Sequence, residues 1–155
     1  MTKTNAVRLM EQAGILCRTA EYEYDENDLR GTHAAHAVGM PEEQVFKTLV
    51  ARGDKQGILV FCIPVCCELD LKKAAKAAGD KKVDLVAVKE LLGLTGYIRG
   101  GCSPIGMKKI YPTFIDETAE LSEEIAVSAG IRGQQMILHP QDLIDYAGMT
   151  VCDLT

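Results

Sequence analysis

The pattern of apolar and polar residues changes between two periods along the chain, which predicts a mixture of strands and helices. Apolar residues that alternate with polar ones indicate half-buried strands, and apolar residues that recur every three or four positions indicate amphipathic helices. The predicted strands are Cys17–Tyr24, Phe46–Arg52, Gly57–Ile63, Val83–Val86, Tyr97–Arg99, Tyr111–Ile115, Glu124–Ser128, Gln135–Leu138 and Val151–Leu154. The predicted helices are Asn5–Ala13, Thr32–Val38, Leu69–Ala78, Val88–Leu92 and a last one from His139 to Ala147.

The order and length of these elements predict the fold class. The helix at Leu69–Ala78 has the clearest apolar stripe, at spacings i, i+3, i+4 and i+7. Residues 93–133 hold half of the chain's 14 glycines, so turns and close backbone approaches are expected there. Many short strands interrupted by short helices indicate an α+β fold. We expect a mixed, mostly antiparallel sheet that curves toward a barrel, with short helices on its flanks.

The stretch Val45–Val50 places a single cation, Lys47, in the middle of an apolar strand. With a period of two, Lys47 shares a face with Val45 and Leu49, and Thr48 lies on the opposite face. An ammonium among apolar neighbours is costly to desolvate unless an anion or water meets it. Two interpretations follow: Lys47 protects an edge strand from unwanted pairing, or it is kept for a bound ligand.

Length and composition are those of an ordinary globular protein. A chain of 155 residues with 47% hydrophobic and 25% charged residues is expected to form one domain, residues 1–155, with a real core. The first eight residues contain no apolar segment of the kind found in secretory signals. The longest uncharged run, Gly57–Cys67, is too short to cross a bilayer. We therefore expect a cytoplasmic protein with no membrane partner.

The six cysteines raise the question of a metal site or a disulfide framework. They include no C-x-x-C pair, and His33 and His36 have no cysteine or further histidine near them in sequence. The sequence therefore predicts no metal and no other cofactor. We expect the cysteines to be small, buried apolar residues in a reducing compartment.

The net charge of −5 argues against strong non-specific binding to nucleic acid. DNA is therefore excluded as an expected partner, and any contact with RNA must come from local clusters of cations. Lysines 72, 73, 76, 81, 82, 108 and 109 form such a cluster in sequence. An equally good interpretation is that they form a solvated helix face.

Several motifs occur together: Val45-Phe-Lys-Thr-Leu-Val50, a loop of the form G-G-x-S-P-x-G at residues 100–106, and Ser128-Ala-Gly-Ile-Arg-Gly133. With the strand that contains Tyr22 and the helix that begins Leu69-Asp-Leu-Lys-Lys73, they are similar in content and order to the YbaK/EbsC family. That family comprises free-standing trans-editing proteins, related to the editing domain inserted in bacterial prolyl-tRNA synthetase. The resemblance covers nearly the whole chain.

The resemblance implies an aminoacyl-tRNA deacylase that releases cysteine from Cys-tRNA(Pro), and possible action on Cys-tRNA(Cys) as well. Apolar pockets separate near-isosteres such as proline and cysteine poorly, so a second site is needed to remove the error. In this family the thiol of the substrate is thought to attack its own ester carbonyl. That agrees with the residues here, which include no evident Ser-His-Asp or Cys-His set. Prolyl-tRNA synthetase is the implied protein partner.

The resemblance also assigns roles to residues on two of the motifs. Lys47 would meet the phosphate or ribose of the 3′-terminal adenosine as a point charge and is the candidate catalytic residue. Thr48 would contribute only if the strand twists or bulges. Gly100 and Gly101 would bring backbone groups close to the ester and the 2′-hydroxyl, and Tyr22 would stack on the adenine or close the pocket.

The remaining implied substrate-binding residues shape the walls of the pocket. Ser103 and Pro104 would set the shape of the double-glycine loop, and Arg132 and Gly133 would form the opposite wall. Each role has a plainer alternative: a core tyrosine, a tight turn for the glycine pair, and a surface cation in a hairpin for the arginine. The order of the motifs favours the pocket.

Two positions depart from the pattern of the family. Some members carry an acidic residue in the turn where this chain has Gln134 and Gln135, and Gln135 can hydrogen-bond but has no charge. Leu29 and Arg30 occupy a place where some relatives have an aromatic residue. The favoured amino acid therefore stays open: Ala-tRNA(Pro) or Ser-tRNA is an alternative substrate. A non-catalytic module for an aminoacyl or nucleotide ligand is an alternative function, and a thiol redox sensor is a more distant one.

Overall fold

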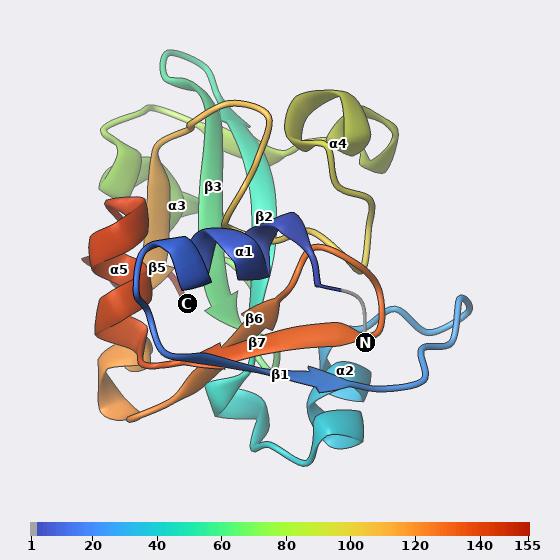
Figure 1. Ribbon diagram of the computed structural model, residues 1–155. Coiled ribbons are helices and arrows are strands. Elements are labelled where there is room, and N and C mark those ends of the chain that lie inside the picture. The colour runs from blue at the N-terminus through green and yellow to red at the C-terminus, as the bar shows by residue number, and fades with distance from the viewer. Residues whose placement is uncertain (1–2) are drawn as a thin grey trace.

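The computed structural model describes residues 3–155, which fold into two β-sheets surrounded by short helices (Figure 1). The helices are α1 (Asn5–Gln12), α2 (Gly31–Val38), α3 (Leu71–Ala78), α4 (Val88–Thr95) and α5 (Pro140–Ala147), with 3-10 helices η1 (Glu42–Gln44) and η2 (Glu117–Leu121). The strands are β1 (Cys17–Glu21), β2 (Phe46–Gly53), β3 (Gly57–Pro64), β4 (Val83–Leu85), β5 (Thr113–Asp116), β6 (Ile125–Ser128), β7 (Gln134–Leu138) and β8 (Thr150–Cys152).

The two sheets differ in size and in strand direction. The smaller one is antiparallel, with the order β1-β7-β6, and the larger one has the order β4-β2-β3-β5-β8. In the larger sheet β2 pairs with β3 and β4 antiparallel, whereas β5 pairs with β3 and β8 parallel. In Figure 1, β2 and β3 run upright and β1 and β7 lie across them. A single bridge from Val45 to Ala126 connects the two sheets.

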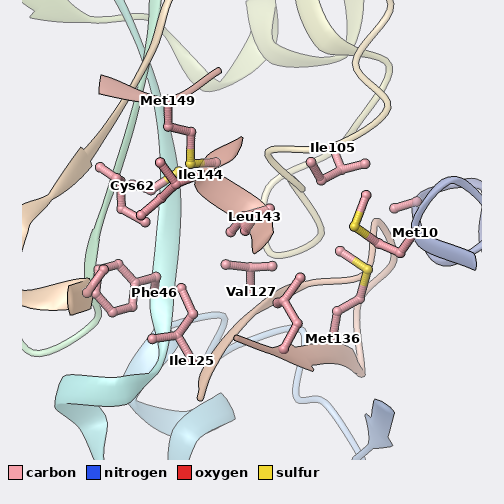
Figure 2. Close-up of a cluster of buried hydrophobic side chains, with 14 of the residues drawn as sticks. Met10, Phe46, Cys62, Ile105, Ile125, Val127, Met136, Leu143, Ile144 and Met149 are labelled. Atoms are coloured by element: carbon pink, nitrogen blue, oxygen red, sulfur yellow. The ribbon is translucent and has the colours of Figure 1, made fainter. Parts of the chain in front are cut away.

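The largest core lies where the two sheets meet and is closed by helices α1 and α5. Phe46 and Cys62 reach it from the larger sheet, and Ile125 and Met136 from the smaller one. Figure 2 shows these side chains around Val127. Burial of apolar side chains at this junction is the main force that fixes the sheets relative to each other, because each fully buried side chain contributes about 1.5–3 kcal/mol.

Helix α3 closes a second core on the other face of the larger sheet. Ala74 and Ala75 pack there with Phe61 of β3 and Phe114 of β5, and the two phenylalanine rings stack with centroids 5.2 Å apart. The side chain of Asp70 caps the helix by accepting hydrogen bonds from the backbone amides of Lys72 and Lys73. The helix therefore begins at Leu71, two residues later than the sequence predicts.

The predicted α+β class and mixed sheet are confirmed, but within residues 3–155 the strands form two sheets that do not close into a barrel. The predicted helices and most predicted strands are found within one to three residues of their expected ends. The strand predicted at Tyr97–Arg99 is wrong. That segment is held as a loop: the amide of Tyr97 donates to Oγ1 of Thr95, 3.0 Å away, and the amide of Gly101 donates to the carbonyl of Ile98.

Candidate active site

A pocket of about 760 Å³ lies beside strand β2, within the size range of sites for small ligands. Figure 1 shows α4 near one end of β2 and α2 near the other, and residues at the start of both helices line the pocket. The other walls come from the stretches 45–50, 65–68 and 99–100, together with Tyr22, Cys102, Ser128 and Gln135. Segments far apart in sequence therefore meet at this one place.

The pocket follows an open edge of β2. One edge of the strand pairs with β3 along its whole length, but β4 covers the other edge only at Ala51–Gly53. In residues 3–155 no strand pairs with this edge at residues 47–49. The carbonyl of Val50 accepts from the amide of Val86 on that side. Because main-chain groups alternate between the two edges, the amide and carbonyl of Thr48 also face the open edge.

This edge explains why residues from both faces of β2 border the pocket. Lys47 and Thr48 point to opposite faces of the strand, yet both line the cavity because it runs along the strand's side. The Thr48 hydroxyl contacts the thiol of Cys62 at 3.8 Å. The sequence predicts that Thr48 reaches the pocket only if the strand twists or bulges. The structure shows that it borders the pocket without either distortion.

Lys47 is a half-buried cation on the wall of this pocket. Among the described residues its ammonium has no ion-pair or hydrogen-bond partner. A cation that has lost part of its hydration without gaining a partner favours an anionic or strongly polar ligand. The edge-strand interpretation also has a basis, since residues 47–49 do form an edge, but that edge faces a cavity.

The double-glycine loop contributes Arg99, Gly100 and Cys102 to the wall of the pocket. Gly100 lines the pocket with a positive φ of 87°, a conformation that side chains disfavour. At Gly101 a Cβ would lie 3.1 Å from the backbone nitrogen of Arg132. The guanidinium Nε of Arg132 donates to the carbonyl of Arg99 at 2.9 Å. The two loops therefore pack against each other, and Arg132 holds the double-glycine loop in place.

Gly133 belongs to the same support. Its carbonyl accepts from the amide of Tyr22, 2.9 Å away, and a Cβ at this position would lie 2.8 Å from the carbonyl oxygen of Tyr22. Gly133 therefore fixes the backbone of Tyr22, which lines the pocket. Arg132 borders a much smaller hollow beside the main pocket, together with Tyr22 and Gly100.

The structure thus divides the predicted site residues into two groups. Those that line the pocket are Tyr22, Lys47, Thr48, Gly100 and Gln135. Those that lie behind its walls are Gly101, Ser103, Pro104, Arg132 and Gly133. Ser103, for example, is fully buried, and its Oγ accepts from the amide of Ile105 at 3.2 Å. Its hydroxyl orders the loop from within.

Gln135 lies on the pocket side of β7, between Ala20 of β1 and Ser128 of β6. The residue is 5% exposed, and its side-chain oxygen Oε1 has no hydrogen-bond partner among the described residues. An unpaired buried carbonyl costs about 1–3 kcal/mol. Rotation of the amide would present either its oxygen or its NH₂ group to a ligand.

Three cysteines line the pocket. The prediction that all six cysteines are buried is confirmed for two of them and is wrong for Cys66; the other three are only partly buried. Cys102 is buried, Cys67 is partly buried and Cys66 is exposed, because Cys66 lies in the turn after Pro64 rather than within β3. Burial raises the pKa of the Cys102 thiol to about 12, and burial also raises the pKa of Cys66. Both thiols are therefore protonated and weakly nucleophilic at neutral pH.

Other walls of the pocket were not expected from the sequence. The start of α2, the Val65–Glu68 turn and residues 85–88 before α4 all contribute, and none of these segments carries a local signal for ligand binding. The lysines proposed as a path for an acceptor stem do not line the pocket. Two of them form ion pairs instead: Lys73 with Asp153 at 2.9 Å, and Lys82 with Asp84 at 3.6 Å.

Residues 3–155 hold neither a metal-binding cluster nor a membrane-spanning helix. No group of three or more His, Cys, Asp or Glu side chains is arranged to hold a metal ion there. None of the helices in that range has the length and apolar character needed to span a bilayer.

Comparison with known proteins identifies the family to which the chain belongs. Residues 31–146 match the aminoacyl-tRNA editing domain family. The chain is 44% identical over 153 residues to a candidate Cys-tRNA(Pro)/Cys-tRNA(Cys) deacylase, EbsC, of Enterococcus faecalis, which covers 99% of this chain and 93% of the relative.

Solved structures share the fold. One described as a candidate trans-editing enzyme for prolyl-tRNA synthetase has a TM-score of 0.83 and 27% identity, over 97% of this chain and 92% of that one. A hypothetical protein with 22% identity has a TM-score of 0.85, over 95% of this chain and 96% of that one, which is a likeness in fold alone. The resemblance inferred from the motifs is confirmed, and the chain belongs to the aminoacyl-tRNA editing domain family.

Proposed function

We propose that the protein is an aminoacyl-tRNA deacylase that removes cysteine from Cys-tRNA(Pro), and that it also accepts Cys-tRNA(Cys). The observation that carries this proposal is the half-buried ammonium of Lys47, which has no partner within residues 3–155 and lies in a pocket that also contains the backbone of Gly100. A terminal nucleotide ester offers groups for both: an anionic phosphate and ribose oxygens for the cation, and a carbonyl for backbone donors. The name of the relative from Enterococcus faecalis supports the same substrate.

In this proposal the residues of the pocket position the ester and do not attack it. Lys47 holds the phosphate or ribose of the terminal adenosine, and Tyr22 packs against the adenine. The backbone at Gly100 approaches the ester because no Cβ stands in the way. Thr48 contributes the main-chain groups of the open edge, and Gln135 offers its amide to the aminoacyl group.

The reaction that suits this pocket uses the thiol of the substrate. Its sulfur bonds to the ester carbonyl carbon, the bond from that carbon to the ribose oxygen breaks, and the thiol proton passes to the ribose oxygen. Water then opens the resulting cyclic thioester. The raised pKa of Cys102 supports this route, because the buried thiol in the wall is not a thiolate at neutral pH. Among the described residues that line the pocket, none is a histidine.

Delivery of the substrate needs help, because the net charge of the chain is −5 and a negative protein binds RNA weakly. We propose that prolyl-tRNA synthetase supplies it by holding the mischarged tRNA close to this protein, which raises the effective concentration of the ester. The proposed substrate places the protein in the cytoplasm, where translation occurs.

A panel of charged tRNAs tests this proposal. Purified protein is assayed with Cys-tRNA(Pro), Cys-tRNA(Cys), Ala-tRNA(Pro) and Ser-tRNA, with and without prolyl-tRNA synthetase. Cysteine should be released fastest, and alanine and serine at least about tenfold more slowly, because the methyl group of alanine is not a nucleophile and the hydroxyl of serine is a weaker one than a thiol. Equal release of alanine would contradict thiol assistance. Binding of the cysteinyl ester without any turnover would contradict the enzyme.

A further inference from the structure

A patch of exposed aliphatic side chains lies at the mouth of the pocket. We call Leu85, Val88 and Leu92 the α4 patch: their side chains belong to residues that are 51%, 62% and 53% exposed, respectively. Val88 and Leu92 are four positions apart on one face of α4. Leu85 and Val88 also line the pocket. The apolar surface is therefore continuous from the cavity to the outside of the molecule, which is a mark of an interaction site.

The charges around this patch favour an anionic partner. Residues 81–99 contain four cations and two anions, although the whole chain has a net charge of −5. Both anions are neutralised within the chain, Glu90 by Arg52 at 3.0 Å and Asp84 by Lys82 at 3.6 Å. Lys89 and Arg99 are exposed and form no ion pair with the described residues. The cations beside the patch thus remain available to a partner.

The helix that carries the patch also has a glycine that nothing inside the chain requires. Gly93 lies within α4 and does not have a positive φ, and a Cβ added there would meet no atom of another described segment within 4 Å. Glycine inside a helix costs roughly 0.5–1 kcal/mol relative to alanine. A bare stretch of exposed backbone next to Leu92 is compatible with the close approach of a flat group such as a nucleobase.

From these features we infer that the α4 patch is the platform for the unpaired nucleotides that precede the terminal adenosine of the tRNA. The inference rests on the proposed function, because it needs the terminal adenosine to occupy the pocket. The bases lie over Val88 and Leu92, and their phosphates face Lys89 and Arg99. Proteins that hold single-stranded nucleic acid without reading its sequence combine a track of cations with side chains, usually aromatic, against which the bases lie; in the α4 patch, aliphatic side chains take that place. A second copy of this chain or another protein would explain the apolar surface but not the unpaired cations.

Two substrates of different length test this platform. The variant Leu92→Ser is compared with the wild type on Cys-tRNA(Pro) and on 3′-O-cysteinyl-adenosine, which lacks the preceding nucleotides; unlike Val88, Leu92 does not line the pocket. We expect kcat/KM to fall about tenfold on the tRNA, as for the loss of one base contact, and to change less than about twofold on the nucleoside ester. Leu16→Ser is the matched control, because Leu16 is 90% exposed and does not line the pocket. It should change neither rate.

A second variant tests the cation beside the patch. Lys89→Gln should reduce the salt dependence of kcat/KM on the tRNA by roughly one unit of log–log slope. The rate on the nucleoside ester should not change.

Each other outcome overturns the inference. Equal rates for wild type and Leu92→Ser on the tRNA would exclude a platform here, and equal losses on both substrates would place Leu92 in the pocket's own chemistry. A loss seen only in the presence of prolyl-tRNA synthetase would assign the patch to that protein. A wild-type dimer in sedimentation that Leu92→Ser breaks would assign it to a second copy. Failure of the wild type on both substrates would instead contradict the proposed function.

Discussion

Asp80 and Lys47 are both charged side chains beside strand β2, but their surroundings are opposite. Asp80 lies where β2 ends and β4 begins, and its carboxylate accepts hydrogen bonds from the backbone amides of Lys55, Gln56 and Lys81 at 3.0, 2.8 and 2.6 Å. Lys47 lies in the first half of the same strand and has no partner among the described residues. Among the described residues, the charged side chain at the end of β2 that β4 covers therefore has hydrogen-bond partners, and the charged side chain at the open edge has none.

This difference separates a structural charge from one that we propose binds a ligand. Asp80 approaches so closely that a Cβ on Gly53 would lie 2.1 Å from its Oδ2, so the glycine, the carboxylate and the β2–β3 turn form one unit. The donors to Asp80 are backbone amides of the turn, so these hydrogen bonds to its carboxylate are part of the fold itself. An ammonium with no partner adds nothing comparable to stability. The position of Lys47 at a pocket wall is the basis for the ligand-binding role proposed for it.

Replacing Asp80 with alanine should remove the hydrogen bonds that hold the β2–β3 turn and should leave the pocket at the open edge of β2 unchanged. We expect a melting temperature lower by several degrees, because the turn amides lose their acceptor, and an unchanged rate of deacylation at temperatures where the variant is folded. Thermal melting by circular dichroism and the deacylation assay measure the two effects. A variant that kept its melting temperature but lost activity would contradict the structural role assigned to Asp80.

The pH dependence of the wild type gives a second test of Asp80. Hydrogen bonds from the amides of Gln56 and Lys55 lower the pKa of this carboxyl. Its contribution to stability is therefore present above the ordinary pKa of an aspartate and lost as the pH falls through the lowered value. Acid unfolding of Asp80→Asn should begin from a lower stability and depend less steeply on pH.

The thiols of Cys62 and Cys102 offer a third case, because they are uncharged at neutral pH. Burial raises the pKa of both Cys62 and Cys102 from 9.0 to about 12. Their raised folded-state values mean that stability is complete below pH 9 and lost as the pH rises toward 12. At pH 10 the loss should be roughly 1 kcal/mol for each thiol. In urea unfolding at pH 8 and pH 10, Cys102→Ala should lose about 1 kcal/mol less than the wild type; an identical loss would contradict the burial of this thiol.

The smallest expected effect concerns helix α4. Gly93→Ala should raise the free energy of unfolding by roughly 0.5–1 kcal/mol, because alanine favours the helix and has room for its methyl group. Gly96→Ala is the matched control and should lower stability, since Gly96 ends the helix with a φ of 86°. Urea unfolding of both variants measures the difference, and a destabilised Gly93→Ala would show that this glycine has a structural role after all.

Much of the fold follows from local sequence signals. The alternation in β2 and β3, the apolar stripe of α3 and the proline at the first position of α5 each predict their element correctly. The segment from Tyr97 to Arg99 misleads because its apolar residues suggest a strand, whereas hydrogen bonds to Thr95 and within the loop make it irregular. Such bonds depend on neighbours that only the folded chain brings close.

The candidate site could be predicted only in part for the same reason. Lys47 is conspicuous in the sequence because a charge interrupts an apolar strand, and Gly100 because two glycines adjoin. The walls from Val65–Glu68 and from Leu85 to Val88 have no such signal, since ordinary apolar residues become a pocket wall only when β2 is left unpaired beside them. The supporting roles of Arg132 and Gly133 likewise come from contacts between distant loops.

The most direct test of the account is the removal of the unpartnered cation. Lys47→Ala is compared with Lys55→Ala, in which an exposed lysine of the β2–β3 turn is lost, in the deacylation of Cys-tRNA(Pro). The account predicts that Lys47→Ala lowers kcat/KM by at least about 100-fold, as expected when a positioning contact is lost, while its melting temperature stays close to that of the wild type and Lys55→Ala keeps full activity. Full activity in Lys47→Ala would contradict it.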